Sequence, residues 1–200
     1  MTGIDLGLGL EDSHVVVTGA GGFIGSATVR AFLQAGAKVT ALDINKTKLD
    51  ELYKSEKRDD TLKNIHSDVV DITSESALED AFQAAHEKFG VVQCCIALAS
   101  LDLSVLPHHE SIVDMPVEQW RRTYQVNVEG TFLTARTWLR QIKAHAKPDL
   151  KNVSLVIVGS ESGWFGERSN PDYASGKSAV QIGLVQSLRG DVARIHPGAR

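Results

Sequence analysis

The feature that most constrains the fold of this chain is a regular alternation of short strand-like runs with helical stretches. The runs occupy residues 14–19, 38–43, 64–69, 91–99 and 153–160. They are continuous rather than alternating in polarity, which is typical of strands covered on both faces. Helices are expected at residues 23–35, 45–57, 75–89, 117–145 and 172–193. This order predicts right-handed βαβ units and an α/β fold with a doubly wound parallel sheet in three layers.

Length and charge narrow the class of protein. Two hundred residues fit one domain, residues 1–200, and a hydrophobic content of 42% allows a sizeable core. The net charge of -4 and the dispersed Lys and Arg residues argue against a nucleic-acid partner. No apolar run approaches the roughly 18 residues of a membrane span. The first fourteen residues lack the basic start and apolar core of a signal peptide, so we expect a cytoplasmic protein.

The chemistry-bearing Cys and His residues do not form a predicted metal site. Cys94 and Cys95 are adjacent in a strand-like run, so their side chains should point to opposite faces and pack in the interior. His108 and His109 are neighbours in the long connection 100–116, where adjacent side chains diverge and no matching cluster appears elsewhere. We read this connection as a surface loop.

Four glycines lie in "TGAGGFIG" (18–25), where the first strand should pass into the first helix. Gly19 would form the tight turn, and Gly21 and Gly22 would let a pyrophosphate approach the backbone. Gly25 would let the helix pack close to the sheet. The helix N-terminus adds free N–H groups and partial positive charge. A tight turn alone would explain only two of these glycines.

Asp43 strengthens the dinucleotide interpretation, because it ends the second strand about 20 residues downstream, where a carboxylate can bind an adenosine ribose. An ordinary helix cap is the alternative. A carboxylate here would repel the 2′-phosphate of NADP, so we expect NAD to be preferred. Lys46 is close enough in sequence to leave this preference open.

Tyr173 and Lys177 are four residues apart in the last predicted helix and share one face. A phenol ionises near pH 10, but a neighbouring ammonium stabilises the phenolate and makes the phenol a usable proton donor or acceptor. An ordinary amphipathic helix would also explain the pair. Ser160 ends the fifth apolar run, so its hydroxyl should join the pair at the carboxyl edge of the sheet.

The chain resembles the short-chain dehydrogenase/reductase family from about Ser13 to Arg200. The resemblance rests on the motifs "TGAGGFIG", Asp68 in "SDV", "NVEGTF" (127–132), "GSESG" (159–163) and "YASGK" (173–177). It implies a single Rossmann-type NAD(P)-binding domain that moves a hydride between the nicotinamide and a secondary alcohol or ketone. The implied cofactor-binding residues are Gly19, Gly21, Gly22, Phe23, Ile24, Gly25, Asp43, Asp68, Val69, Ala99, Tyr173 and Lys177.

The resemblance also implies a catalytic set. Ser160 would bind the substrate oxygen and Tyr173 would move the proton. Lys177 would stabilise the phenolate and hold the nicotinamide ribose. Asn127 would kink the helix 117–145 and hold a water in the proton relay; a polar Asn amid "VNV" and "TFLTA" is awkward in a purely apolar face. Trp164 and Phe165, between the serine and the tyrosine, could wall a substrate pocket or simply pack.

Two departures from the family pattern keep other functions open. Phe23 in "GGFIG" follows the extended type of the family, and "ALAS" (97–100) replaces the usual Asn-Asn-Ala-Gly. Ala97 and Leu98 cannot make the hydrogen bonds of those asparagines, which leaves the support of the central sheet unexplained. An NAD-retaining sugar-nucleotide epimerase or dehydratase is therefore an alternative, and a non-catalytic dinucleotide-binding scaffold is a third.

Assembly and completeness follow from the same resemblance. The family assembles through its two long helices, here 117–145 and 172–193, so we expect a homodimer or homotetramer. The sequence reads "RIHPGAR" and stops at Arg200, where a sixth strand should begin. We therefore expect an incomplete domain whose fifth strand leaves an open apolar edge, which favours aggregation.

Overall fold

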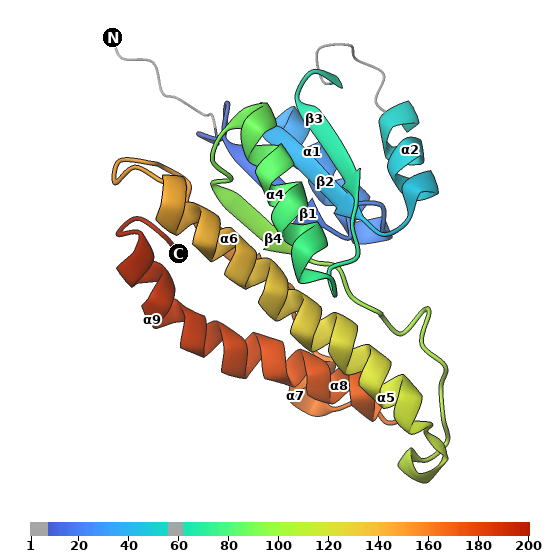
Figure 1. Ribbon diagram of the computed structural model, residues 1–200. Coiled ribbons are helices and arrows are strands. Elements are labelled where there is room, and N and C mark those ends of the chain that lie inside the picture. The colour runs from blue at the N-terminus through green and yellow to red at the C-terminus, as the bar shows by residue number, and fades with distance from the viewer. Residues whose placement is uncertain (1–7, 56–61) are drawn as a thin grey trace.

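The computed structural model describes residues 8–55 and 62–200, which form a five-stranded parallel sheet between two layers of helices (Figure 1). The strand order is β3-β2-β1-β4-β5, as a doubly wound fold requires. The strands are β1 (His14–Thr18), β2 (Lys38–Asp43), β3 (Ile65–Val69), β4 (Cys94–Ala97) and β5 (Ser154–Ile157). The predicted sheet is confirmed. The runs 91–99 and 153–160 are longer than their strands, because their end residues leave the ladder to form the connecting loops.

Helices cover both faces of the sheet. Helices α1 (Phe23–Gln34) and α2 (Lys46–Ser55) pack on one face. Helices α4 (Glu75–Phe89) and α6 (Thr131–His145) pack on the other, with α9 (Val185–Ile195) beside α6 (Figure 1). Residues 56 and 57 of the helix predicted at 45–57 lie outside the described part of the chain.

Each of the two long helices contains a π-helical segment. The first runs through α5 (Val117–Tyr124), the π-helical η2 (Gln125–Gly130) and α6. The second runs through α8 (Pro171–Ser178), the π-helical η3 (Ala179–Leu184) and α9. Such segments are often found at functional sites. Asn127 lies inside η2, so the irregularity expected at this residue is a widened turn. The short helices η1 (Ile112–Asp114) and α7 (Ser162–Phe165) were not expected from the sequence.

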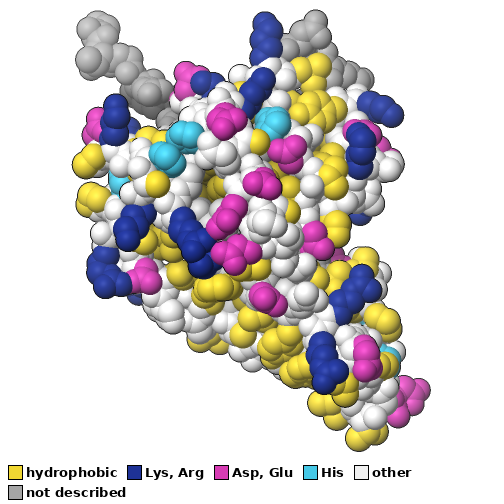
Figure 2. Space-filling model, viewed as in Figure 1, with side chains coloured by type: hydrophobic (Ala, Val, Ile, Leu, Met, Phe, Trp, Pro, Cys, Tyr) yellow, Lys and Arg dark blue, Asp and Glu magenta, His cyan; other side chains and the backbone are white. Residues whose placement is uncertain are grey.

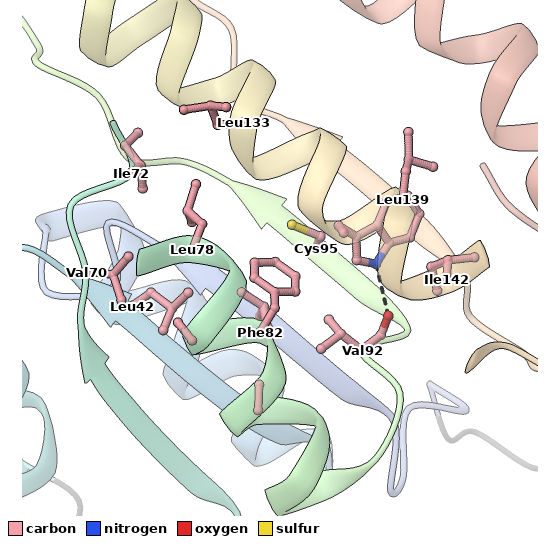
Figure 3. Close-up of a cluster of buried hydrophobic side chains, with 14 of the residues drawn as sticks. Leu42, Val70, Ile72, Leu78, Phe82, Val92, Cys95, Leu133, Leu139 and Ile142 are labelled. Carbon is pink, nitrogen blue, oxygen red and sulfur yellow. Dashed lines mark hydrogen bonds between the residues drawn. The ribbon is translucent and has the colours of Figure 1, made fainter. Parts of the chain in front are cut away.

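The core divides into two clusters because successive strand residues point to opposite faces. Val15 and Cys94 face α1 and α2, whereas Val16 and Cys95 face α4 and α6. Trp138 is fully buried in the second cluster, and its indole Nε1 donates to the carbonyl oxygen of Val92 at 2.9 Å (Figure 3). Both cysteines are free and buried on opposite faces, as predicted.

The edge of the sheet at β5 is partly paired. The backbone N–H of Leu155 donates to the carbonyl oxygen of Arg200 at 3.0 Å, and the N–H of Arg200 donates to that of Val153 at 3.1 Å. Val156, in the middle of the strand, remains 43% exposed. The edge that we expected to be open therefore makes two backbone hydrogen bonds with Arg200, one accepted and one donated by that residue.

Candidate active site

The predicted site residues gather at the carboxyl edge of the sheet. Gly19 follows β1, Asp43 ends β2, Ala99 follows β4 and Ser160 follows β5. In a parallel sheet all these strand ends lie at one edge, which is where ligands of open α/β sheets bind. The structure therefore brings together residues that are far apart in the sequence.

The glycine turn after β1 is close-packed in a way that excludes larger residues. Gly19 has a φ of +69°, and a Cβ atom on it would lie 2.8 Å from the Cα of Ala99. A Cβ on Gly25 would lie 2.1 Å from the carbonyl oxygen of Gly19. Gly22 caps α1 without a side chain, so the first-turn N–H groups of the helix can face an anion. This bare cradle fits the pyrophosphate of a dinucleotide.

Asp43 joins the end of β2 to the glycine turn. Its Oδ2 accepts a hydrogen bond from the N–H of Gly21 at 2.8 Å, and its Oδ1 accepts from that of Asn45 at 2.8 Å. Lys46, which left the cofactor preference open, pairs with Asp50 at 3.0 Å. The nearby cation is therefore engaged by a carboxylate of its own helix.

The remaining predicted cofactor residues line this part of the edge. Asp68, in β3, lies 3.0 Å from the imidazole Nε2 of His66, and Val69 beside it is 55% exposed. Phe23 and Ile24, at the start of α1, are exposed. Apolar surface and a carboxylate thus flank the glycine turn at this edge.

Thr18 supplies the support that the side chains of Ala97 and Leu98 in "ALAS" cannot give to the central sheet. Its buried Oγ1 accepts hydrogen bonds from the backbone N–H groups of Leu98 at 3.1 Å and Ala99 at 3.2 Å. The same hydroxyl lies 3.4 Å from the carbonyl oxygen of Ile96, to which it donates. A side chain of β1 thus fixes the loop after β4. Threonine is a common strand residue, so the sequence carries no signal for this support.

Tyr173 and Lys177 lie on one buried face of α8, as predicted. They are 8% and 5% exposed, and the Lys177 Nζ lies 5.8 Å from the centroid of the Tyr173 ring. The ammonium also donates to the carbonyl oxygen of Val158 at 2.9 Å. Burial lowers the pKa of Lys177 from its ordinary value, and the negative charge of Asp102 opposes this shift.

Ser160 lies in the turn between β5 and α7. Its Oγ accepts a hydrogen bond from the N–H of Ser162 at 3.2 Å. Its own N–H donates to the Oε1 of Gln181 at 2.7 Å. Gln181 was not singled out in the sequence, although it follows Tyr173 and Lys177 at a further four-residue step.

Asn127 is buried and clamps the loop after β4. Its Oδ1 accepts from the N–H of Leu101 at 2.7 Å, and its Nδ2 donates to the carbonyl oxygen of the same residue at 2.9 Å. Both polar atoms of the side chain are thus engaged by one backbone residue. This clamp was missed in the sequence, and the water-holding role implied by the family stays a prediction.

A buried polar network holds the start of α8. The Oδ2 of Asp172, which precedes the tyrosine, accepts from the hydroxyl of Thr123 at 2.7 Å and from the Nε2 of Gln119 at 3.3 Å. Asn170 donates to the carbonyl oxygen of Pro107 at 2.8 Å. The network ties the start of α8, the helix that carries Tyr173, to α5 and to the connection 100–116.

The remaining candidates from the sequence are the loop histidines and the two aromatic residues that follow Ser160. Among residues 8–55 and 62–200, no group of three or more His, Cys, Asp or Glu side chains could hold a metal ion. His109 hydrogen-bonds to Gln119 at 2.8 Å. Trp164 and Phe165 are 67% and 89% exposed on α7, so neither is core packing. None of the helices in the described ranges has the length and apolar character needed to cross a bilayer.

The chain matches known proteins over nearly its whole length. The family model for short chain dehydrogenases matches residues 13–196. The rat protein "Dehydrogenase/reductase SDR family member 6" is 30% identical over 182 residues, which are 91% of this chain and 66% of that protein. Fluoren-9-ol dehydrogenase of Terrabacter sp. (strain DBF63) is 30% identical over 199 residues, covering 92% of this chain and 55% of the relative.

The fold matches as well. The crystal structure of an NAD+-bound xylitol dehydrogenase superposes with a TM-score of 0.84 at 24% identity, covering 96% of this chain and 68% of that one. This likeness shows a Rossmann-type α/β fold. The family model covers most of the chain, so the chain belongs to the short-chain dehydrogenase family. The epimerase alternative is not favoured by these matches.

Proposed function

We propose that this chain transfers a hydride between NAD and a small secondary alcohol or ketone, with Ser160, Tyr173, Lys177 and Asn127 as its catalytic set. One observation carries the proposal: the buried ammonium of Lys177 lies beside the Tyr173 ring and binds the backbone two residues before Ser160. A scaffold that only bound a dinucleotide would have no use for the whole set of Ser160, Tyr173, Lys177 and Asn127.

The roles follow from the chemistry of each group. In alcohol oxidation, the Tyr173 phenolate would take the hydroxyl proton of the substrate while the carbinol carbon loses its hydride. Ser160 would hold the substrate oxygen, and Lys177 would stabilise the phenolate. The nicotinamide, when bound, supplies the hydride acceptor or donor. Asn127 would keep the loop after β4 in place beside the reacting groups and hold the relay water.

The cofactor would lie along the carboxyl edge of the sheet, with its pyrophosphate on the glycine turn and its adenosine between Asp43 and Asp68. NAD is the expected form, because the Asp43 carboxylate would repel a 2′-phosphate and Lys46 is paired with Asp50. Titration with NADH and NADPH, followed by nicotinamide fluorescence, tests this preference. Tighter binding of NADPH would contradict it.

The deciding experiment compares the wild type with Tyr173→Phe in a screen of secondary alcohols and ketones, followed by nicotinamide absorbance. The variant should lose turnover by a factor of about 100 or more and bind NADH as the wild type does, because only the proton-transferring hydroxyl is removed. Substantial turnover by the variant would refute the assignment. Turnover without release of NADH or NAD to solution would favour the epimerase.

Assembly and location complete the proposal. Apolar side chains gather over the two long helices (Figure 2), and Trp120, Tyr124, Val128 and Phe132 line a groove on the first of them. A second copy of the chain would cover this groove in a homodimer or homotetramer. The buried, unpaired state of Cys94 and Cys95 agrees with the reducing conditions of the cytoplasm, where we place the protein.

A further inference from the structure

Gln181 makes an unusual contact with the turn that carries Ser160. It lies in the π-helical η3, and its side chain reaches back to the loop after β5. Its Oε1 accepts the backbone N–H of Ser160 at 2.7 Å. This contact is the only hydrogen bond that the structure gives to the Ser160 N–H within the described part of the chain.

Two glycines provide the space for the Gln181 amide. A Cβ atom on Gly159 would lie 2.2 Å from the Oε1 of Gln181, and one on Gly163 would lie 2.6 Å from its Nε2. The amide therefore lies against both Gly159 and Gly163, the two ends of the "GSESG" turn. Real Cβ atoms do not approach other atoms so closely, so any larger residue at either position would displace Gln181.

The hydrogen bond with Ser160 fixes the orientation of the Gln181 amide and leaves its nitrogen unpaired. The oxygen must face the Ser160 N–H, which leaves the Nε2 of Gln181 buried with no hydrogen-bond partner among the described residues. A buried donor without a partner destabilises the folded protein, and an apolar side chain here would avoid that penalty. The hydrogen bond from the Ser160 N–H to the Oε1 of Gln181 is the favourable contact that accompanies this unpaired Nε2.

The same helix face holds the loop at a second point. Tyr173, Lys177 and Gln181 follow one another at steps of four residues. Lys177 binds the carbonyl oxygen of Val158 at 2.9 Å, and Gln181 binds the N–H of Ser160 two residues further along. Two hydrogen bonds from one helix thus fix the serine relative to the tyrosine on that helix.

We propose that Gln181 is a positioning residue, which sets the backbone of Ser160 so that its hydroxyl and that of Tyr173 address the same substrate oxygen. The inference rests on the proposed function of Ser160 and Tyr173. It assigns no contact with substrate or cofactor to Gln181, whose polar atoms are occupied by or buried under the turn.

The test compares Gln181→Met, which keeps the shape of the side chain but removes the acceptor, with Gln181→Glu, which restores an acceptor. Gln186→Met, on the exposed side of α9, is the matched control.

In Gln181→Met the Ser160 amide should exchange its hydrogen about tenfold faster or more, because its partner is lost. The kcat should fall about 10- to 100-fold with the NADH dissociation constant unchanged, as expected for a misplaced reacting group. Gln181→Glu should recover most of both losses, and Gln186→Met should change neither quantity.

A second variant disturbs the hydrogen bond between Gln181 and Ser160 by a change in the turn instead of in the helix. Gly159→Ala should displace the Gln181 amide and speed exchange at Ser160, and adding Gln181→Ala should remove the clash but not restore kcat. An unchanged Ser160 amide or an unchanged kcat in Gln181→Met would overturn the proposal. If Gln181→Met does not fold, unchanged exchange and kcat in Gly159→Ala would overturn it equally. Wild-type turnover by Ser160→Ala would instead refute the proposed function, and the exchange measurement would still report whether Gln181 holds the turn.

Discussion

The Oγ1 of Thr18 accepts the backbone N–H of Ala99 at 3.2 Å, and Ala99 is the residue against which Gly19 packs. The hydroxyl at the end of the first strand thus holds Ala99, the residue that packs against the glycine turn. This relationship links the stability of the central sheet to the shape of the cofactor cradle.

Thr18→Val should destabilise the protein and weaken cofactor binding together. The substitution keeps the shape of the side chain but leaves the half-buried N–H groups of Leu98 and Ala99 without their acceptor, which should cost about 2 kcal/mol of unfolding free energy. Urea unfolding measures the loss, and NADH titration measures the weaker binding. Thr18→Ser, which keeps the hydroxyl, is the control, and equal stability of the two variants would contradict the role of Thr18.

Lys177→Met should remove most turnover near neutral pH, by a factor of about 100 or more, because the Tyr173 phenolate would lose its neighbouring cation. Burial lowers the pKa of Lys177, so the wild type should lose turnover as this ammonium gives up its proton at high pH, and the variant should lack that fall. The pH profile of kcat distinguishes this effect from a general loss of structure. Lys88→Met, at an exposed position of α4, should keep the wild-type profile. A Lys177→Met profile that matched the wild type in shape would contradict the proposed role.

Most of the fold could be predicted because its signals are local. The strand-like runs and the glycine turn each occupy a few consecutive residues, and the parallel order of the sheet follows from their alternation with helices. The predicted strand ends were less accurate at β4 and β5. Apolar character continues into residues such as Val158 that line the site but do not belong to the strand.

The supports of the site could not be predicted, because they join segments far apart in the sequence. Thr18 binds Ala99 and Gln181 binds Ser160, and these residues come together only when the chain folds. Threonine in a strand and glutamine in a helix are ordinary residues there, so neither carries a signal. The π-helical segments also could not be predicted from the hydrophobic pattern, because one widened turn changes the helical periodicity very little.

The pH dependence of stability should be dominated in mild acid by His14. This histidine is 1% exposed, with Nδ1 donating to the carbonyl oxygen of Gly90 and Nε2 accepting from the hydroxyl of Thr40. Burial lowers the pKa of His14 from 6.5 to about 4. The unfolded chain therefore binds a proton that the folded protein does not between these pH values. Stability should fall by on the order of 3 kcal/mol as the pH drops through this range, with no further loss from His14 below it.

Urea unfolding of the wild type at several pH values between 7 and about 4 checks this prediction. His14→Gln should be less stable at pH 7, because the buried hydrogen bonds are disturbed, but should lose less on acidification. His108→Gln, at an exposed loop position, should follow the wild type. Equal slopes for the wild type and His14→Gln would show that another group governs the acid response.

The state of assembly should depend on the groove on the first long helix. Phe132 is 45% exposed and lies where the groove beside Trp120 and Tyr124 meets the apolar surface of Leu188. In a twofold assembly each substitution occurs in both copies, so Phe132→Glu would place two carboxylates in one interface. Sedimentation velocity should show a dimer or tetramer for the wild type and a shift toward monomer for the variant. Val113→Arg, at an exposed position of η1, is the control and should leave the assembly intact. A monomeric wild type would refute the assembly proposal, and equal dissociation by both variants would move the interface away from this groove.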